Sequence, residues 1–61
     1  MKKVTITKAT GEIGVLILAD DGKWDITLNG AKAAANYHYD TAQVNKIIVG
    51  AKAAGSAVII E

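Results

Sequence analysis

The side chains best suited to chemistry gather in one short segment, Tyr37-His38-Tyr39. This segment holds two of the three aromatic residues and the only histidine, and it stands directly before a predicted helix. Phenol and imidazole donors beside a helix N-terminus can bind an anion or recognise a polar group of a partner. Tyr37, His38 and Tyr39 are therefore a candidate recognition cluster. The favoured alternative is that the two tyrosines extend the core and leave His38 in solvent, since Asp40 already brings a negative charge to that helix end.

No pattern typical of an enzyme accompanies these groups. His38, Ser56 and an aspartate could nominally form a catalytic set, but nothing places them together. The Ala-Gly-Ser-Ala context of Ser56 is not a nucleophile elbow. There is no cysteine, and Asp20-Asp21-Gly22 is only a fragment of a calcium loop. We therefore expect no catalytic residues, no metal site and no cofactor, and we do not assign an enzymatic role.

The basic charge comes entirely from seven lysines, and six acidic residues leave a formal net charge of +1. Such a balance attracts nucleic acid or acidic lipid only weakly. Lys3 and Lys32, expected on one face of the predicted sheet, could contact phosphates. However, the chain has no arginine for bidentate contacts and no exposed aromatic pair for base stacking. A weak lysine-based nucleic-acid-binding domain is therefore an alternative function and not the favoured one.

With 61 residues, the chain is expected to form a single domain over residues 1–61. A chain of this size buries only about 60% of the surface that it exposes when unfolded, so its core is thin and self-association becomes attractive. No apolar run approaches the ~20 residues needed to cross a bilayer. Met1-Lys2-Lys3 resembles the start of a secretion signal, but the alternating segment after it offers no continuous apolar region. We expect a cytoplasmic protein without membrane contact.

Three dipeptides, Thr10-Gly11, Asp21-Gly22 and Asn29-Gly30, stand at hairpin spacing. Asp-Gly and Asn-Gly favour two-residue type I′ turns, and Thr10-Gly11 is a weaker signal of the same length. Taken as two-residue turns, all three place the apolar residues of four successive segments on one sheet face, because side chains alternate along a strand. The apolar face would hold Val4, Ile6, Ile13, Val15, Ile17, Ala19, Trp24, Ile26, Leu28, Ala31, Ala33 and Ala35. The opposite face would hold Lys3, Thr5, Thr7, Asp25, Thr27, Lys32, Ala34 and Asn36, together with Leu16 and Leu18.

Leu16 and Leu18 are the anomaly of this arrangement. They would lie on the polar face beside Thr5 and Thr27, where two neighbouring exposed leucines suggest a contact patch. The alternative is that scattered surface leucines need no explanation, or that the strand is buried on both sides. We interpret Leu16, Leu18, Thr5 and Thr27 as a candidate protein interface, with a homodimer through this outer sheet face as one form.

The second half of the chain predicts a helix that begins after an Asp40 cap, with Gln43 completing a capping box. Its apolar stripe would cover the apolar sheet face, and Gly55 would end it. The last residues, 57–60, predict a short strand beside either the first strand or the fourth. Residues 31–36 could form the fourth strand or a helical turn, since alanine favours helix.

The predicted fold class is therefore α+β: a small antiparallel meander of three or four strands packed on one helix, followed by a C-terminal strand. The favoured function is a small non-catalytic protein-binding module that regulates or inhibits a larger protein, either as a single chain or as a homo-oligomer. A structural subunit of a larger assembly is a further alternative.

Overall fold

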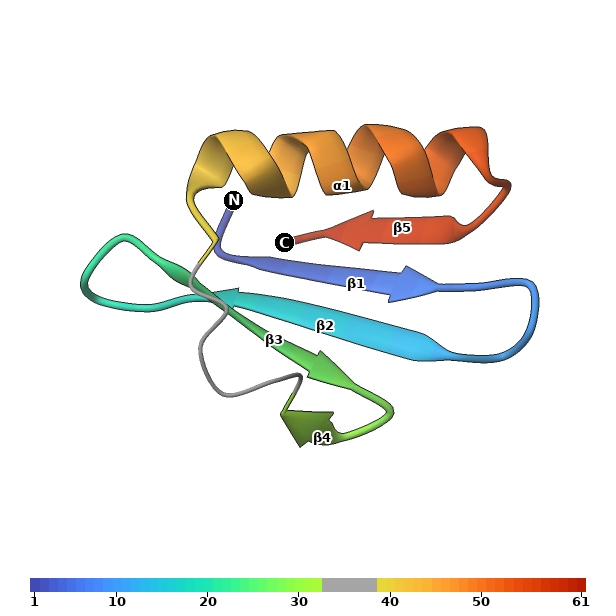
Figure 1. Ribbon diagram of the computed structural model, residues 1–61, viewed down its shortest axis with the longest axis horizontal. Coiled ribbons are helices and arrows are strands. Elements are labelled where there is room, and N and C mark those ends of the chain that lie inside the picture. The colour runs from blue at the N-terminus through green and yellow to red at the C-terminus, as the bar shows by residue number, and fades with distance from the viewer. Residues whose placement is uncertain (33–38) are drawn as a thin grey trace.

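The computed structural model describes residues 1–32 and 39–61 of the chain (Figure 1). Within these ranges the elements follow one another in the order expected for a meander that continues into a helix and a last strand. They are β1 (Lys3–Thr7), β2 (Ile13–Leu18), β3 (Trp24–Leu28), β4 (Ala31–Lys32), α1 (Thr41–Ala53) and β5 (Ala57–Ile60).

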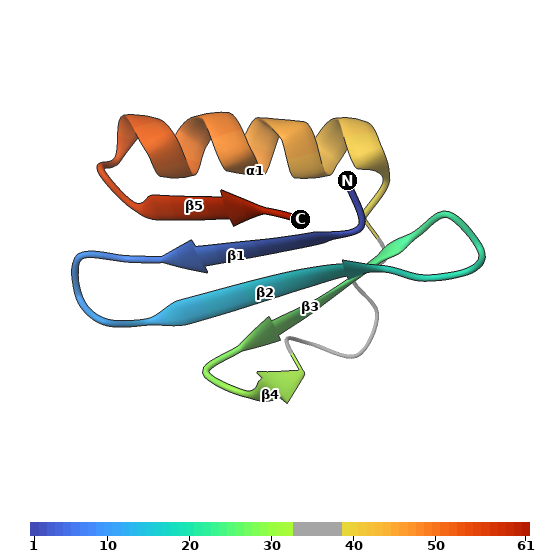
Figure 2. The ribbon, with the colours of Figure 1, turned by 180° about the vertical axis from the view of Figure 1, so that it is seen from behind.

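The strands form one sheet in the order β4-β3-β2-β1-β5, and every neighbouring pair is antiparallel. The last strand therefore lies beside the first, as Figures 1 and 2 show from opposite sides, and the open choice between two edges is settled. The predicted fold class, an α+β meander packed on one helix and followed by a C-terminal strand, is confirmed.

Local signals at both ends of α1 explain where the helix begins and ends. The Asp40 side chain accepts a hydrogen bond from the Gln43 backbone N–H at 2.8 Å, and the Gln43 side chain accepts from the Asp40 N–H at 2.9 Å. This is the predicted capping box. At the other end, Gly55 has a φ of +84° and donates to the Lys52 carbonyl, while Ser56 donates to the Ala51 carbonyl. These two bonds form a Schellman motif that satisfies the last carbonyl groups of the helix.

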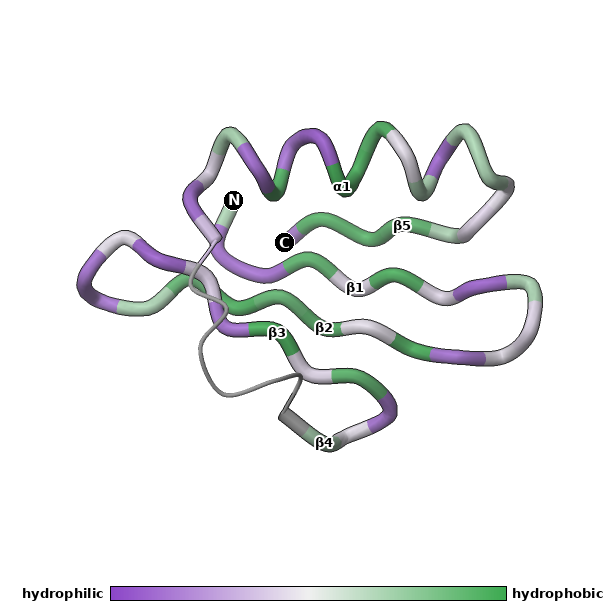
Figure 3. The backbone as a smooth tube through the Cα atoms, viewed as in Figure 1, coloured by the Kyte–Doolittle hydropathy of each residue, from purple (hydrophilic) through white to green (hydrophobic). Residues whose placement is uncertain are grey.

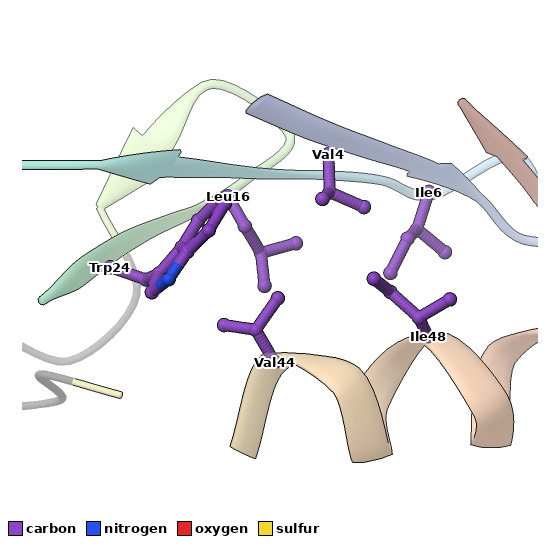
Figure 4. Close-up of a cluster of buried hydrophobic side chains, with 6 residues drawn as sticks. All are labelled: Val4, Ile6, Leu16, Trp24, Val44 and Ile48. Carbon is purple, nitrogen blue, oxygen red and sulfur yellow. The ribbon is translucent and has the colours of Figure 1, made fainter. Parts of the chain in front are cut away.

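The core lies between α1 and one face of the sheet. Its buried side chains come from β1, β2 and β3 on the sheet side and from α1 on the other side, and Figure 4 shows them pointing toward one another: Val4, Ile6, Leu16, Trp24, Val44 and Ile48. The buried Trp24 also donates from Nε1 to Thr41 Oγ1 at 3.1 Å, and its backbone N–H donates to the Tyr39 carbonyl at 2.8 Å. Trp24 therefore joins β3 to the start of the helix by packing and by two hydrogen bonds.

The predicted register of β2 is wrong by one residue on both sides. Val4 lies opposite Leu16 instead of Ile17, and Trp24 lies opposite Leu18 instead of Ala19. Two-residue type I′ turns would require positive φ at both central residues. Among the described residues, Asn29 is the only non-glycine with a positive φ, so the first two hairpins cannot use such turns.

Both of these hairpins instead use three-residue loops that end in glycine at positive φ. Around the first loop, the Lys8 N–H donates to the Glu12 carbonyl at 2.9 Å, and Gly11 donates to the Lys8 carbonyl at 2.9 Å. Around the second, Ala19 donates to the Lys23 carbonyl and Gly22 to the Ala19 carbonyl. A three-residue loop closed by such a glycine is the next most common hairpin connection.

The predicted β1–β2 and β2–β3 registers are each wrong by one residue. The two shifts cancel between β1 and β3, so only the side chains of β2 lie on the face opposite to the predicted one. The inner face, defined as the sheet face toward α1, still receives the predicted residues of β1 and β3. From β2 it receives Leu16 and Leu18, while Ile13, Val15 and Ile17 lie on the opposite face. The predicted apolar face is therefore correct for two strands and wrong for the strand between them.

The third hairpin agrees with the prediction. Leu28 lies opposite Ala31 across the two-residue turn Asn29-Gly30. Asn29 also receives a hydrogen bond from the Ile13 N–H at its side-chain oxygen, 2.9 Å away, and so ties this turn to β2. Ala31 and Lys32 form strand, which is one of the two alternatives left open for residues 31–36, whereas the expected positions of Ala33, Ala34, Ala35 and Asn36 lie outside the described residues.

Candidate functional site

The sheet face that points away from α1, called here the outer face, is the candidate site. Because Val4 and Ile6 point toward the helix, alternation places the residues between them on the other side of β1. The strand registers then extend this face across the sheet. Its side chains in β1, β2, β3 and β5 are Lys3, Thr5, Thr7, Ile13, Val15, Ile17, Asp25, Thr27, Ala57 and Ile59.

One row of cross-strand neighbours runs through the middle of the outer face. Thr27 lies opposite Val15, Val15 opposite Thr5, and Thr5 opposite Ile59. Thr27 Oγ1 donates to the Val15 carbonyl at 3.4 Å, and the side chains of Val15 and both threonines are half-buried. The centre of the outer face is therefore a strip of β-branched side chains, the residue types that pack well on a pleated surface.

Three isoleucines of this face remain open to solvent. Ile13 is 43% exposed, Ile17 is 48% exposed and Ile59 is 58% exposed. Ile17 lies between the charged residues Lys3 and Asp25 of the neighbouring strands. Exposed apolar side chains with polar and charged residues beside them are a mixture that protein interfaces also contain.

The structure corrects the residues proposed for this surface. Leu16 is buried in the core, and Leu18 is partly buried and packs against it, so neither lies on the outer face. The reason is the pair of three-residue loops, which turn β2 over. Thr5 and Thr27 do lie on the outer face, as predicted. The residues that sequence reasoning missed are Ile13, Val15, Ile17 and Ile59.

The candidate recognition cluster is described only in part, because Tyr37 and His38 lie outside the described residues. Tyr39 is partly buried, packs against the core and forms an isolated bridge with Trp24. Its position is therefore that of a residue joining the helix start to the sheet. The set of His38 with Ser56 stays untested for the same reason.

A cavity of about 590 Å³ opens between the inner face and the C-terminal half of α1. Small residues widen it on both sides: Gly14 in β2, Gly50 and Ala51 in the helix, and Ala54 directly after the helix. A Cβ atom added to Gly50 would meet nothing within 4 Å, so close packing does not require glycine there. Charged side chains, Lys8 and Glu12, stand among the residues that line it.

The part of the chain that the structure describes contains neither a membrane-spanning helix nor a cluster of metal-ligating side chains. No helix in residues 1–32 and 39–61 combines the length and the apolar composition needed to span a membrane. In the same ranges, no three histidine, cysteine or acidic side chains gather as metal ligands would.

Comparison with known proteins adds no relative: no family model matches the chain, and neither the curated proteins nor the solved structures contain a significant match.

Proposed function

We propose that this chain is a small non-catalytic protein-binding module that contacts a partner protein through the outer face of its sheet. In this proposal the partner is a larger protein that the module regulates or inhibits. The observation that carries the proposal is the exposure of Ile13, Ile17 and Ile59 on a sheet face without a covering helix among the described elements.

The energetics support the same surface. Burial of an exposed isoleucine against a partner is favourable by roughly 25 cal/mol per Å² of apolar surface removed from water. A face of β-branched residues also loses little side-chain freedom on binding, because these side chains are already restricted at χ1. Charged neighbours such as Lys3 and Asp25 would orient a partner rather than supply most of the affinity.

The test compares the wild-type chain with Ile17→Lys and with Val49→Lys as a matched control. Val49 is 68% exposed and lies in α1, away from the outer face, so it offers the same substitution at a different surface. Each variant is immobilised and exposed to a lysate of the cells that produce the protein, and retained proteins are quantified by mass spectrometry. We expect a partner that is retained by wild type and by Val49→Lys but lost with Ile17→Lys.

The proposal is wrong if all three chains retain the same proteins in the same amounts. Circular dichroism of each variant shows that a loss of binding does not come from a loss of fold. Ile17 is suited to this test because it is half-exposed and lies outside the core, so a lysine there should leave the sheet intact.

A further inference from the structure

The strand β5 ends the sheet on one side, and half of its backbone groups point away from the molecule. Lys3 and Glu61 exchange two backbone hydrogen bonds, of 3.2 and 2.8 Å. In an antiparallel ladder such pairs alternate with pairs that do not exchange bonds. Ile59 therefore bonds toward β1, while the N–H and C=O groups of Val58 and Ile60 point outward from the edge. Within the described residues no hydrogen bond to these four groups is found.

The residues of β5 include no charged side chain, no proline and no bulge, which are three of the features that normally prevent strands of two molecules from pairing. Sheet edges are usually protected by charged residues, by proline, by a bulge or by very short strands. β5 has the sequence Ala-Val-Ile-Ile and continues without a bulge along β1. Figure 3 shows its hydrophobic character along most of its length. Ile59 and Ile60 are 58% and 47% exposed. The opposite edge, by contrast, is the two-residue strand β4.

We infer that β5 pairs with β5 of a second copy of this chain, antiparallel about a two-fold axis at Ile59. In this register Val58 of each copy exchanges two hydrogen bonds with Ile60 of the other, so all four outward groups of each strand are satisfied. An antiparallel strand pair is self-complementary under a two-fold axis, which is the commonest symmetry of homo-oligomers. The two sheets join into one continuous sheet.

The side chains agree with this register. Ile59 meets Ile59 of the second copy on the outer face, and Val58 meets Ile60 on the inner face, so each of these cross-strand contacts is apolar. Glu61, which follows the strand, comes opposite Ala57 and meets no like charge. A second copy therefore offers the edge both the backbone partners and the apolar side-chain contacts that it lacks.

The inference goes beyond the proposed function, because it concerns the edge of the sheet and not its outer face. Pairing at β5 would nevertheless bring the two outer faces together, with the two Ile59 side chains at the centre of a surface twice as wide. A partner protein would then meet two copies of the module at once.

Sedimentation equilibrium across concentration tests the pairing on wild type, Ile60→Pro, Ile60→Val and Ile17→Lys. Of the backbone hydrogen-bonding groups, proline at position 60 removes one outward N–H, which edge strands tolerate, and it leaves the bonds to β1 intact. Each dimer loses two hydrogen bonds, so we expect the dissociation constant to rise by roughly 30-fold or more. Ile60→Val keeps the N–H and should dimerise like wild type. Ile17→Lys changes the outer face alone and should also dimerise.

A second measurement does not depend on a substitution. Hydrogen exchange of the wild-type chain should show the Val58 and Ile60 amides protected at high concentration and exchanging quickly on dilution, while the Ile59 amide stays protected throughout. A wild-type chain that is monomeric at all concentrations, or a dimer lost with Ile17→Lys but kept with Ile60→Pro, would overturn the inference. In the latter case the outer face, and so the proposed function, would still stand.

Discussion

The two faces of the sheet differ in how far the described part of the chain buries their side chains. On the inner face, side chains of α1 close over Val4, Ile6, Leu16 and Trp24, which are all buried. On the outer face, residues of the same chemical type remain partly open to solvent. The contrast is sharpest within β2, where the adjacent residues Leu16 and Ile17 are 2% and 48% exposed.

This comparison shows that apolar composition alone does not identify the core of a small sheet. β2 is apolar on both faces, and its burial follows from the position of α1 and from the register, not from its sequence. The inner face supplies stability, because each buried side chain there is packed against others. Among the residues that the structure describes, the outer face keeps apolar surface that is open to solvent.

The largest expected effect tests this contrast directly with two neighbouring substitutions. Leu16→Ala removes a buried side chain and should lower the free energy of unfolding by about 2–5 kcal/mol. Ile17→Ala, its matched control on the other face, should lower it by less than about 1 kcal/mol, because a half-exposed side chain leaves no closed cavity. Chemical denaturation of both variants at concentrations where the chain is monomeric measures the difference. Equal losses would show that the outer face is buried as deeply as the inner one.

A smaller effect is expected from removing the N-terminal cap of α1, the helix that covers the inner face. Asp40→Ala removes the side chain that accepts from the Gln43 N–H and should cost about 1 kcal/mol of stability. Asn45→Ala, at an exposed position inside the same helix, should change stability by less than about 0.5 kcal/mol. Binding through the outer face should persist in the folded Asp40→Ala protein. A loss of binding without unfolding would mean that the two faces are coupled.

The smallest expected effect is a gain. Gly50→Ala should stabilise the chain by about 0.5–1 kcal/mol, because alanine is a better helix former and the added methyl group enters open space. Gly55→Ala is the contrasting control, since its φ of +84° disfavours any side chain and should make the same substitution destabilising. Thermal unfolding of the two variants checks the opposite signs. A destabilised Gly50→Ala variant would show that the cavity beside the helix is less open than its walls indicate.

The ends of the helix were predictable because their signals are local. A capping box and a glycine stop act within a few residues, so Asp40, Gln43 and Gly55 could be assigned from sequence alone, and the structure confirms all three. The helix stripe was also identified correctly, since Val44 and Ile48 are buried. The pairing of β5 with β1, by contrast, depends on residues fifty or more positions apart, and the sequence left two choices open for it.

The register of β2 could not be predicted from the two sequence signals that normally fix a strand register. The turn dipeptides indicated the wrong loop length, and the hydrophobic pattern favoured neither register. Thr10-Gly11 and Asp21-Gly22 fit the tip of a two-residue turn and also the end of a three-residue loop. The hydrophobic pattern did not separate these options, because either face of β2 is apolar. Thr5 and Thr27 were assigned correctly to the outer face because they lie on β1 and β3. In β2, which lies between them, Leu16 and Leu18 were assigned to the outer face, whereas Val15 and Ile17 lie there.

The pairing of the first strand with the last has a consequence for the order in which the chain can fold. The β1–β2 and β2–β3 hairpins join residues that are close in sequence, so they can close early at little entropic cost. β1 then keeps an open side until the segment after α1 arrives to pair with it. During synthesis on a ribosome, a nascent chain would expose that side of β1 to any other strand for as long as residues 57–60 are still inside the exit tunnel. The arrival of β5 completes the sheet and also moves the vulnerable edge outward by one strand.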